Sequence, residues 1–254
     1  MAQDIGATGA RFSIGRVLST SFQVLLRNLV PFFVIAVIIG IPYILVTLLF
    51  ASSIDVAEIE ATGQVPAGFW GMWAIAMLIS ILTYSLTQSA IVYGTVQDLR
   101  GQKASFGDCL SRGLASMPRV IVAALLANIA IMIGFVLLVV PGIVLILMWW
   151  VLIPALVIEG SGIGQSFARS RALTSGHRWA ILGLLLIVVI ALWVINFVIG
   201  LLTMALGVAV AQVINLAVTF VFMAFASVLS AVGYYQLRAE KEGILIDDLA
   251  KVFE

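Results

Sequence analysis

Long apolar runs, separated by short polar segments, make up most of the chain. A helix needs about 20 predominantly apolar residues to cross the hydrocarbon core of a bilayer, which is about 30 Å thick. Inside lipid every backbone N–H and C=O group must be paired within the chain, so runs of this kind form helices. The pattern predicts six transmembrane helices, at residues 29–51, 69–96, 120–140, 142–158, 179–202 and 208–235.

Two boundaries between these helices depend on short breaks in the apolar pattern. Pro141 and Gly142 interrupt the stretch VLLVVPGIVLIL, and we expect them to form the turn between the third and fourth spans. The break at Gly207 is weaker. Without it, the last two spans would be one long helix, and the C-terminus would lie on the opposite side of the membrane.

The composition supports the same fold class. Hydrophobic residues account for 63% of the chain and charged residues for only 10%, whereas a soluble domain carries roughly 25% charged residues. We therefore expect an all-α integral membrane protein. The chain has one cysteine, Cys109, and one histidine, His177. No intramolecular disulfide can form, and we expect no metal site and no cofactor.

The basic residues indicate how the spans are oriented. With six spans and a cytoplasmic N-terminus, all 13 Lys and Arg residues fall on the cytoplasmic side. The loop at 52–68 has no basic residue and carries Asp55, Glu58 and Glu60. This distribution follows the positive-inside rule. It predicts that both termini are cytoplasmic, and we expect no cleaved signal peptide before the first span.

Three cytoplasmic segments that precede spans resemble one another, and their glycines Gly15, Gly107 and Gly164 align. Each segment has apolar residues at helical spacing, which is typical of a helix lying in the headgroup region of a membrane. The simpler alternative is that any basic amphipathic segment before a span looks similar. The repeat predicts a single transmembrane domain, 1–254, made of an interfacial helix plus a transmembrane hairpin three times. The units are residues 12–96, 105–158 and 162–235, followed by a cytoplasmic tail at 236–254.

The segment VIEGSGIGQSFARSRALTSGHRW, at 157–179, and the later YYQLRAEKEG carry a family-like pattern. In these two segments the chain resembles the bacterial glycerophosphoryl diester phosphodiesterase membrane domain family and the related YciC-like membrane proteins. The resemblance concerns the membrane part only, without a phosphodiesterase domain. It implies a membrane module of the bacterial inner membrane rather than an esterase.

A group of charged residues in this region is the best candidate site. Glu159 ends the fourth predicted span, and basic residues follow it on an expected interfacial helix. One hypothesis is a structural ion pair of Glu159 with Arg169 or Arg171. The other is contact with anionic lipid headgroups, which attract juxtamembrane basic residues. The two are compatible, and catalysis is the least favoured alternative. The cluster comprises Glu159, Arg169, Arg171, His177 and Arg178.

Polar but uncharged residues lie within the predicted spans, whereas no ionisable residue lies in the middle of one. Ionisable groups inside a helical bundle are typical of proton relays and charged filters, so those functions are disfavoured. The uncharged polar residues either line a hydrophilic cavity or pack helices together through hydrogen bonds. They are Thr83, Thr87, Gln88, Asn128, Asn196 and Asn215.

These features predict a non-enzymatic scaffold or accessory subunit of a membrane complex, with contacts to anionic phospholipids. The partner is either a larger protein complex or a second copy of the chain. The alternative is a transporter or flippase-like protein for lipids or small amphiphiles. A phospholipid-headgroup hydrolase is a further, less favoured alternative. Nucleic acid is not expected as a partner, because the chain has no strongly basic domain.

Overall fold

The computed structural model describes residues 12–53, 68–103 and 105–243. Within these ranges the chain is helical and contains no strand. Most of the predicted outer loop, residues 54–67, and the end of the predicted tail, residues 244–254, lie outside the described residues. The helices are α1 (Ile14–Arg27), α2 (Leu29–Ser53), α4 (Phe69–Leu99), α5 (Phe106–Leu137), α6 (Val139–Met148), α7 (Leu152–Glu159), α8 (Ile163–Thr174), α9 (Arg178–Leu206) and α10 (Val208–Glu242).

Six of the described segments are long and apolar enough to cross a membrane. They are α2, α4, α5, the pair α6 and α7 taken together, α9 and α10. Each corresponds to one of the six predicted spans. The break at Gly207 is present, with φ 82° and ψ 161° joining α9 to α10. The structure is thus compatible with a multi-pass membrane protein, and the side on which the termini lie stays a prediction.

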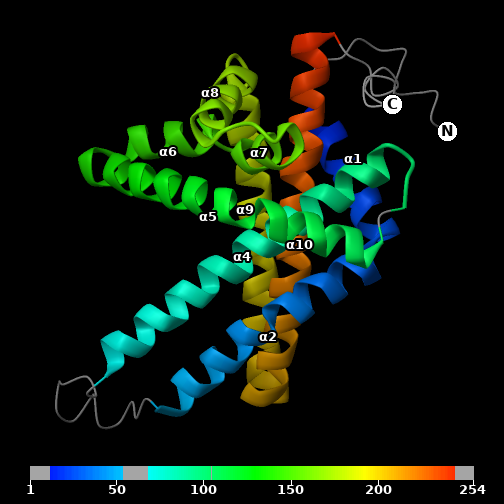
Figure 1. Cartoon of the computed structure of the whole chain (residues 1–254). Helices are drawn as coiled ribbons and strands as arrows, with labels where there is room; N and C mark the ends of the chain where they lie inside the picture. The colour runs from blue at the N-terminus through cyan, green and yellow to red at the C-terminus, as the bar shows by residue number, and fades with distance from the viewer. Residues whose placement is uncertain (1–11, 54–67, 104, 244–254) are drawn as a thin grey trace.

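The long helices form three hairpins: α2 with α4, α5 with α6, and α9 with α10. In Figure 1, α9 and α10 run side by side along the vertical, α2 and α4 leave them diagonally, and α5 and α6 run across them. The hairpins meet where α1, α7, α8 and the last turns of α10 lie, and we call this region the charged end. Away from it the hairpins diverge.

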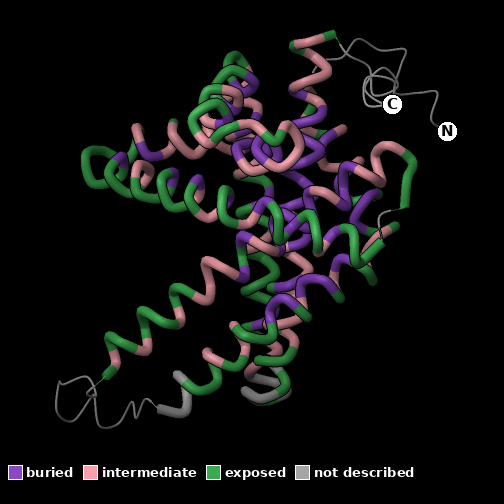
Figure 2. Tube along the Cα trace, viewed as in Figure 1, coloured by how far each residue is buried: buried purple, intermediate pink, exposed green. Residues whose placement is uncertain are grey.

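The core lies where the hairpins meet, and Figure 2 shows the buried residues concentrated there. In the span windows, 56% of α10 is buried but only 17% of α9. Small residues permit the close helix contacts in this core. A Cβ atom at Gly94 would lie 2.8 Å from the Phe32 ring, and one at Gly233 would overlap the ring of Trp150.

The second predicted interfacial helix is not a separate element. α5 is one continuous helix from Phe106 to Leu137, with Pro118 inside it. Its start agrees with the sequence pattern, because the hydroxyl of Ser105 accepts a hydrogen bond from the backbone N–H of Asp108 at 3.1 Å. A buried stripe of Gly113, Ser116, Val120, Ala123 and others runs on past Pro118. Packing along this stripe explains why the helix does not end there.

The first and third predicted amphipathic helices are separate, as α1 and α8. α1 ends at Arg27, and the side-chain amide of the next residue, Asn28, donates to the carbonyl oxygen of Val24 at 3.0 Å. The chain turns after α8 at Gly176, where φ is +88°. A positive φ costs glycine little, since it has no Cβ atom. A separate short helix therefore precedes the first and third hairpins but not the second.

The prediction that Pro141 and Gly142 form a turn is wrong. The turn lies at Leu138, whose extended backbone separates α5 from α6. Pro141 lies in the first turn of α6, where the missing N–H has no helical partner to lose. Gly142 instead permits close packing, because a Cβ atom there would lie 2.6 Å from Cγ of Phe135. A second break, at Trp149 to Val151, separates α6 from α7.

Candidate functional site

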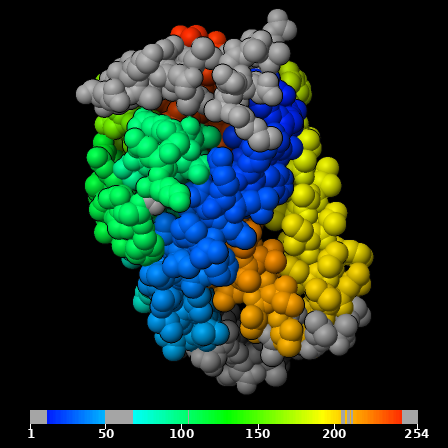
Figure 3. All heavy atoms as spheres, turned by 90° about the vertical axis from the view of Figure 1, so that its right-hand side faces the viewer, coloured from blue at the N-terminus to red at the C-terminus, as the bar shows by residue number. Residues whose placement is uncertain are grey.

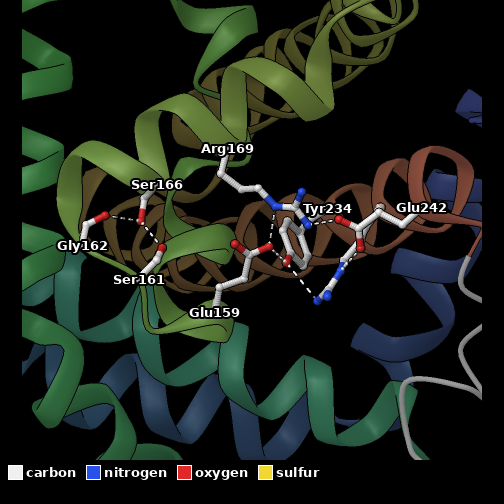
Figure 4. Close-up of polar contacts among 8 residues, drawn as sticks. Glu159, Ser161, Gly162, Ser166, Arg169, Tyr234 and Glu242 are labelled. Atoms are coloured by element: carbon white, nitrogen blue, oxygen red, sulfur yellow. Dashed lines mark hydrogen bonds and ion pairs between the residues drawn. The ribbon is translucent and has the colours of Figure 1, made fainter. Parts of the chain in front are cut away.

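The charged end brings the ends of α7 and α10 together with α8. Glu159 is the last residue of α7, and Gly160 ends that helix with φ 62°. At the start of α8, the hydroxyl of Ser166 donates to the carbonyl oxygen of Gly162 at 3.1 Å. The same hydroxyl lies 3.0 Å from that of Ser161 (Figure 4). This short connection directs α8 back across α10.

Five side chains form one ion-pair and hydrogen-bond cluster, which we call the Glu159 network. Arg169 Nε donates to Glu159 Oε1 at 2.6 Å, and its Nη2 pairs with Glu242 (Figure 4). Arg238 Nε contacts the other carboxylate oxygen of Glu242 at 2.7 Å. The hydroxyl of Tyr234 donates to Glu159 Oε1 at 2.5 Å. The network joins α7, α8 and α10.

The charges of the Glu159 network balance one another. Two carboxylates face two guanidinium groups, and the side chains of Arg169 and Glu159 are only 28% and 20% exposed. Burial by itself lowers the pKa of Arg169, but its hydrogen bonds to Glu159 and Glu242 and their charges outweigh burial and raise it above the ordinary value. Because removing one member of a buried pair leaves an uncompensated charge, this network is suited to holding α8 in place.

His177 belongs to a second contact at the charged end. Its Nε2 lies 3.0 Å from Glu240 Oε2, an ion pair when the histidine is protonated. The backbone N–H of Phe12 donates to the same carboxylate oxygen at 2.5 Å. The rings of Phe12 and His177 lie 5.7 Å apart. This contact fastens the segment before α1 and the start of α9 to α10.

Arg171 and Arg178 are separated from both contacts. They line a pocket of about 360 Å³ between α8 and the start of α9, together with Ala168, Ala172 and Ser175. In the described part of the chain neither arginine has an ion-pair partner, and Nε of Arg178 is buried without a hydrogen-bond partner. The structure thus divides the sequence-predicted cluster into three: Glu159 pairs with Arg169, His177 contacts Glu240, and Arg171 and Arg178 line this pocket.

Tyr234, Arg238, Glu240 and Glu242 were not predicted as site residues. The spacing of four between Tyr234, Arg238 and Glu242 places them on one face of a helix. This spacing is the feature of the sequence that could have indicated them as site residues. Arg238 finds its partners on this same face. Tyr234 and Glu242, however, also contact residues far earlier in the chain; the hydrogen bond of Arg169 to Glu242 spans 73 positions. No local pattern in the sequence reports such a contact.

The polar residues of the spans do not meet in one cavity. Thr83, Thr87 and Gln88 are buried in α4. The three asparagines are exposed. The amides of two of them donate to carbonyl oxygens of their own helices, Asn128 to Ala124 at 2.8 Å and Asn196 to Leu192 at 2.9 Å. The third is Asn215 of α10. The structure thus divides the predicted set into a buried part on α4 and an exposed part elsewhere.

Some polar atoms of α4 lack partners. Gln88 donates from Nε2 to the hydroxyl of Tyr84 at 2.9 Å, whereas its Oε1 is buried without a hydrogen-bond partner among the described residues. The hydroxyls of Ser85, Thr87 and Thr95 are in the same situation. As for metals, the described ranges contain no group of three or more His, Cys, Asp or Glu side chains that could hold an ion.

A protein-family comparison matches residues 103–237 to a domain of unknown function, DUF7847. The matched range includes α5 to α9 and most of α10, and with them Glu159, Arg169 and the pocket arginines. The comparisons do not support the resemblance to the phosphodiesterase membrane domain or the YciC-like proteins. No curated protein and no solved structure matches the chain. Since the matched range is more than half of the chain, the protein belongs to the DUF7847 family.

Proposed function

We propose that this protein is a non-enzymatic scaffold or accessory subunit of a membrane complex in the bacterial inner membrane. In this proposal the six apolar segments cross the bilayer, and both termini and the charged end are cytoplasmic. The observation that carries the proposal is the Glu159 network. Its carboxylates and guanidinium groups are engaged with one another, so the site is suited to joining helices.

The surface of the hairpins supports this role. From the place where they meet, the hairpins extend in different directions (Figure 1) and expose large apolar side chains. Examples are Val136 and Leu137 at the end of α5 and Phe197 of α9, which are 82%, 71% and 69% exposed. Apolar surface of this kind is covered by lipid or by a partner protein. Helices held together by the Glu159 network, with exposed apolar hairpins extending from them, suit a protein that holds other membrane components in place.

Transport of lipids or small amphiphiles is the second candidate function. One observation favours it: side-chain oxygen atoms of Thr87 and Gln88 in α4 are buried and have no hydrogen-bond partner in the part of the chain that the structure describes. In a transporter these atoms would face a passing polar group. Against this, Asn128, Asn196 and Asn215 are exposed and lie on three other helices. For headgroup hydrolysis, the only histidine would be the natural base, and it is already engaged with Glu240.

The proposal is tested by purifying the tagged protein, expressed at its natural level, in native lipid particles and identifying what accompanies it by mass spectrometry. A protein partner in fixed stoichiometry is the expected result. The Arg169→Gln variant should lose that partner in part, because α8 would no longer be held to α10. Lys103→Gln, which removes an exposed positive charge outside the Glu159 network, is the control. A monomer accompanied by no protein, in both native and overexpressing membranes, would contradict the proposal.

A further inference from the structure

The pocket between α8 and α9 has a surplus of positive charge. Arg171 and Arg178 line it. The ammonium group of Lys241 donates to the carbonyl oxygen of Ala172, another lining residue, at 2.8 Å. The glutamates of the charged end already have other partners. Glu159 and Glu242 bind the arginines of the Glu159 network, and Glu240 contacts His177. The pocket arginines are therefore left uncompensated among the described residues.

The available donors match the chemistry of a phosphate group. Guanidinium groups donate to phosphate oxygens in a two-pronged geometry. Among the described residues Nε of Arg178 is buried without a hydrogen-bond partner, and an unpaired buried donor is costly, so a ligand oxygen that reached it would be stabilised. Arg178 is also the first residue of the 29-residue helix α9, and its N-cap residue His177 makes no side-chain cap. The free N–H groups and the dipole at such an end favour an anion.

The surface next to the pocket indicates what carries the phosphate. α9 exposes large apolar side chains along much of its length, and five of them form a stripe on one face that begins beside Arg178. Figure 3 shows α9 (yellow) at the surface of the molecule. Trp179 at its start is 86% exposed and Trp193 is 78% exposed. The spacing of 7, 4, 3 and 4 residues keeps the stripe on one helical face. Its residues are Trp179, Leu186, Ile190, Trp193 and Phe197.

We propose that this pocket binds the phosphate of an anionic phospholipid headgroup, with an acyl chain lying along the α9 stripe. A free phosphate ion could accept the same hydrogen bonds from the arginines, but it has no apolar part to contact the α9 stripe. The inference rests on the proposed membrane location of the protein. It adds a specific lipid site to the scaffold role and does not depend on which protein partner the scaffold holds.

The test is native mass spectrometry of the full-length protein, purified in detergent and titrated with phosphatidylglycerol or, in parallel, with phosphatidylcholine. The wild-type protein should retain phosphatidylglycerol preferentially. The double variant Arg171→Gln, Arg178→Gln should bind it about thirtyfold more weakly, given the attraction of two basic residues for an acidic headgroup. The matched control is Arg16→Gln with Lys103→Gln, which removes the same charge from elsewhere and should bind as the wild type does.

Three results would overturn the inference. One is equal retention of both lipids by the wild-type protein, a measurement that needs no variant. Another is equal loss in the control pair, which would indicate a diffuse charge effect. The last is displacement of phosphatidylglycerol by excess inorganic phosphate, which would make the pocket a site for a free anion. Arg171→Lys with Arg178→Lys, expected to fold normally, should weaken binding in part. None of these results bears on the protein-partner experiment, so the two proposals fail separately.

Discussion

Arg169 and Arg171 lie two residues apart on the same short helix, yet the structure gives them different surroundings. Arg169 contacts two carboxylates from α7 and α10. Arg171 faces an open pocket and has no ion-pair partner in the described part of the chain. Two helical positions correspond to a rotation of about 200°, so neighbours in the sequence point to opposite sides. One arginine holds the fold together, and the other is available to a ligand.

The largest expected effect comes from breaking the Glu159 network. Arg169→Gln leaves Glu159 and Glu242 partly buried without their shared cation, and we expect the protein to lose about 2–3 kcal/mol of stability. Chemical unfolding in detergent micelles measures the change. Arg171→Gln, on the opposite side of α8, should change stability by less than about 0.5 kcal/mol. Equal losses in the two variants would remove the distinction between the two arginines.

A smaller effect is expected from Tyr234→Phe. The change removes only the hydroxyl that donates to Glu159 at 2.5 Å, and a hydrogen bond to a charged group contributes about 1.5–3 kcal/mol. We expect a loss near the lower limit, because Arg169 still binds Glu159. Tyr43→Phe on α2 is the control: it makes the same chemical change, the loss of a phenol hydroxyl, outside the Glu159 network. A stability equal to that of the wild type would show that the hydroxyl bond adds nothing to the ion pairs.

The pocket arginines should affect stability only when lipid is present. A ligand that binds only the folded protein raises its stability, and the gain grows with ligand concentration. Added phosphatidylglycerol should therefore raise the melting temperature of the wild-type protein and of Arg169→Gln. In the Arg171→Gln, Arg178→Gln double variant the same rise should require a much higher lipid concentration, in proportion to its weaker binding. Thermal scans at several lipid concentrations measure this, and a full rise in the double variant at the same concentrations would contradict the assignment.

The smallest effect is expected at the exposed asparagines. Asn196→Leu removes an amide that only donates back to the carbonyl oxygen of Leu192 in its own helix. We expect a change within about 0.5 kcal/mol in detergent unfolding. Thr87→Val, on the buried face of α4, is the comparison, since it removes a hydroxyl without a partner among the described residues. A marked loss for Asn196→Leu would indicate a polar partner at that position and would favour transport.

Sequence reasoning located the helices well, since length and apolarity suffice to identify a helix that can cross a bilayer. The break at Gly207 was also predictable, because glycine tolerates the positive φ that the connection needs. Pro141 and Gly142 were misassigned for a related reason. Proline is as suitable in the first turn of a helix as in a turn. Glycine serves close packing as readily as chain reversal, and only the position of Phe135 shows which applies.

The amino-acid sequence by itself determined the all-helical class, the six apolar segments and the concentration of charge between them, because these follow from the nature and order of residues along one chain. Tertiary structure alone decided that α5 continues through Pro118, that Glu159 pairs with Arg169 and not Arg171, and that the span asparagines are exposed. These outcomes depend on the rotation of each helix relative to distant neighbours. Contacts such as Arg169 with Glu242, 73 positions apart, leave no local pattern in the sequence.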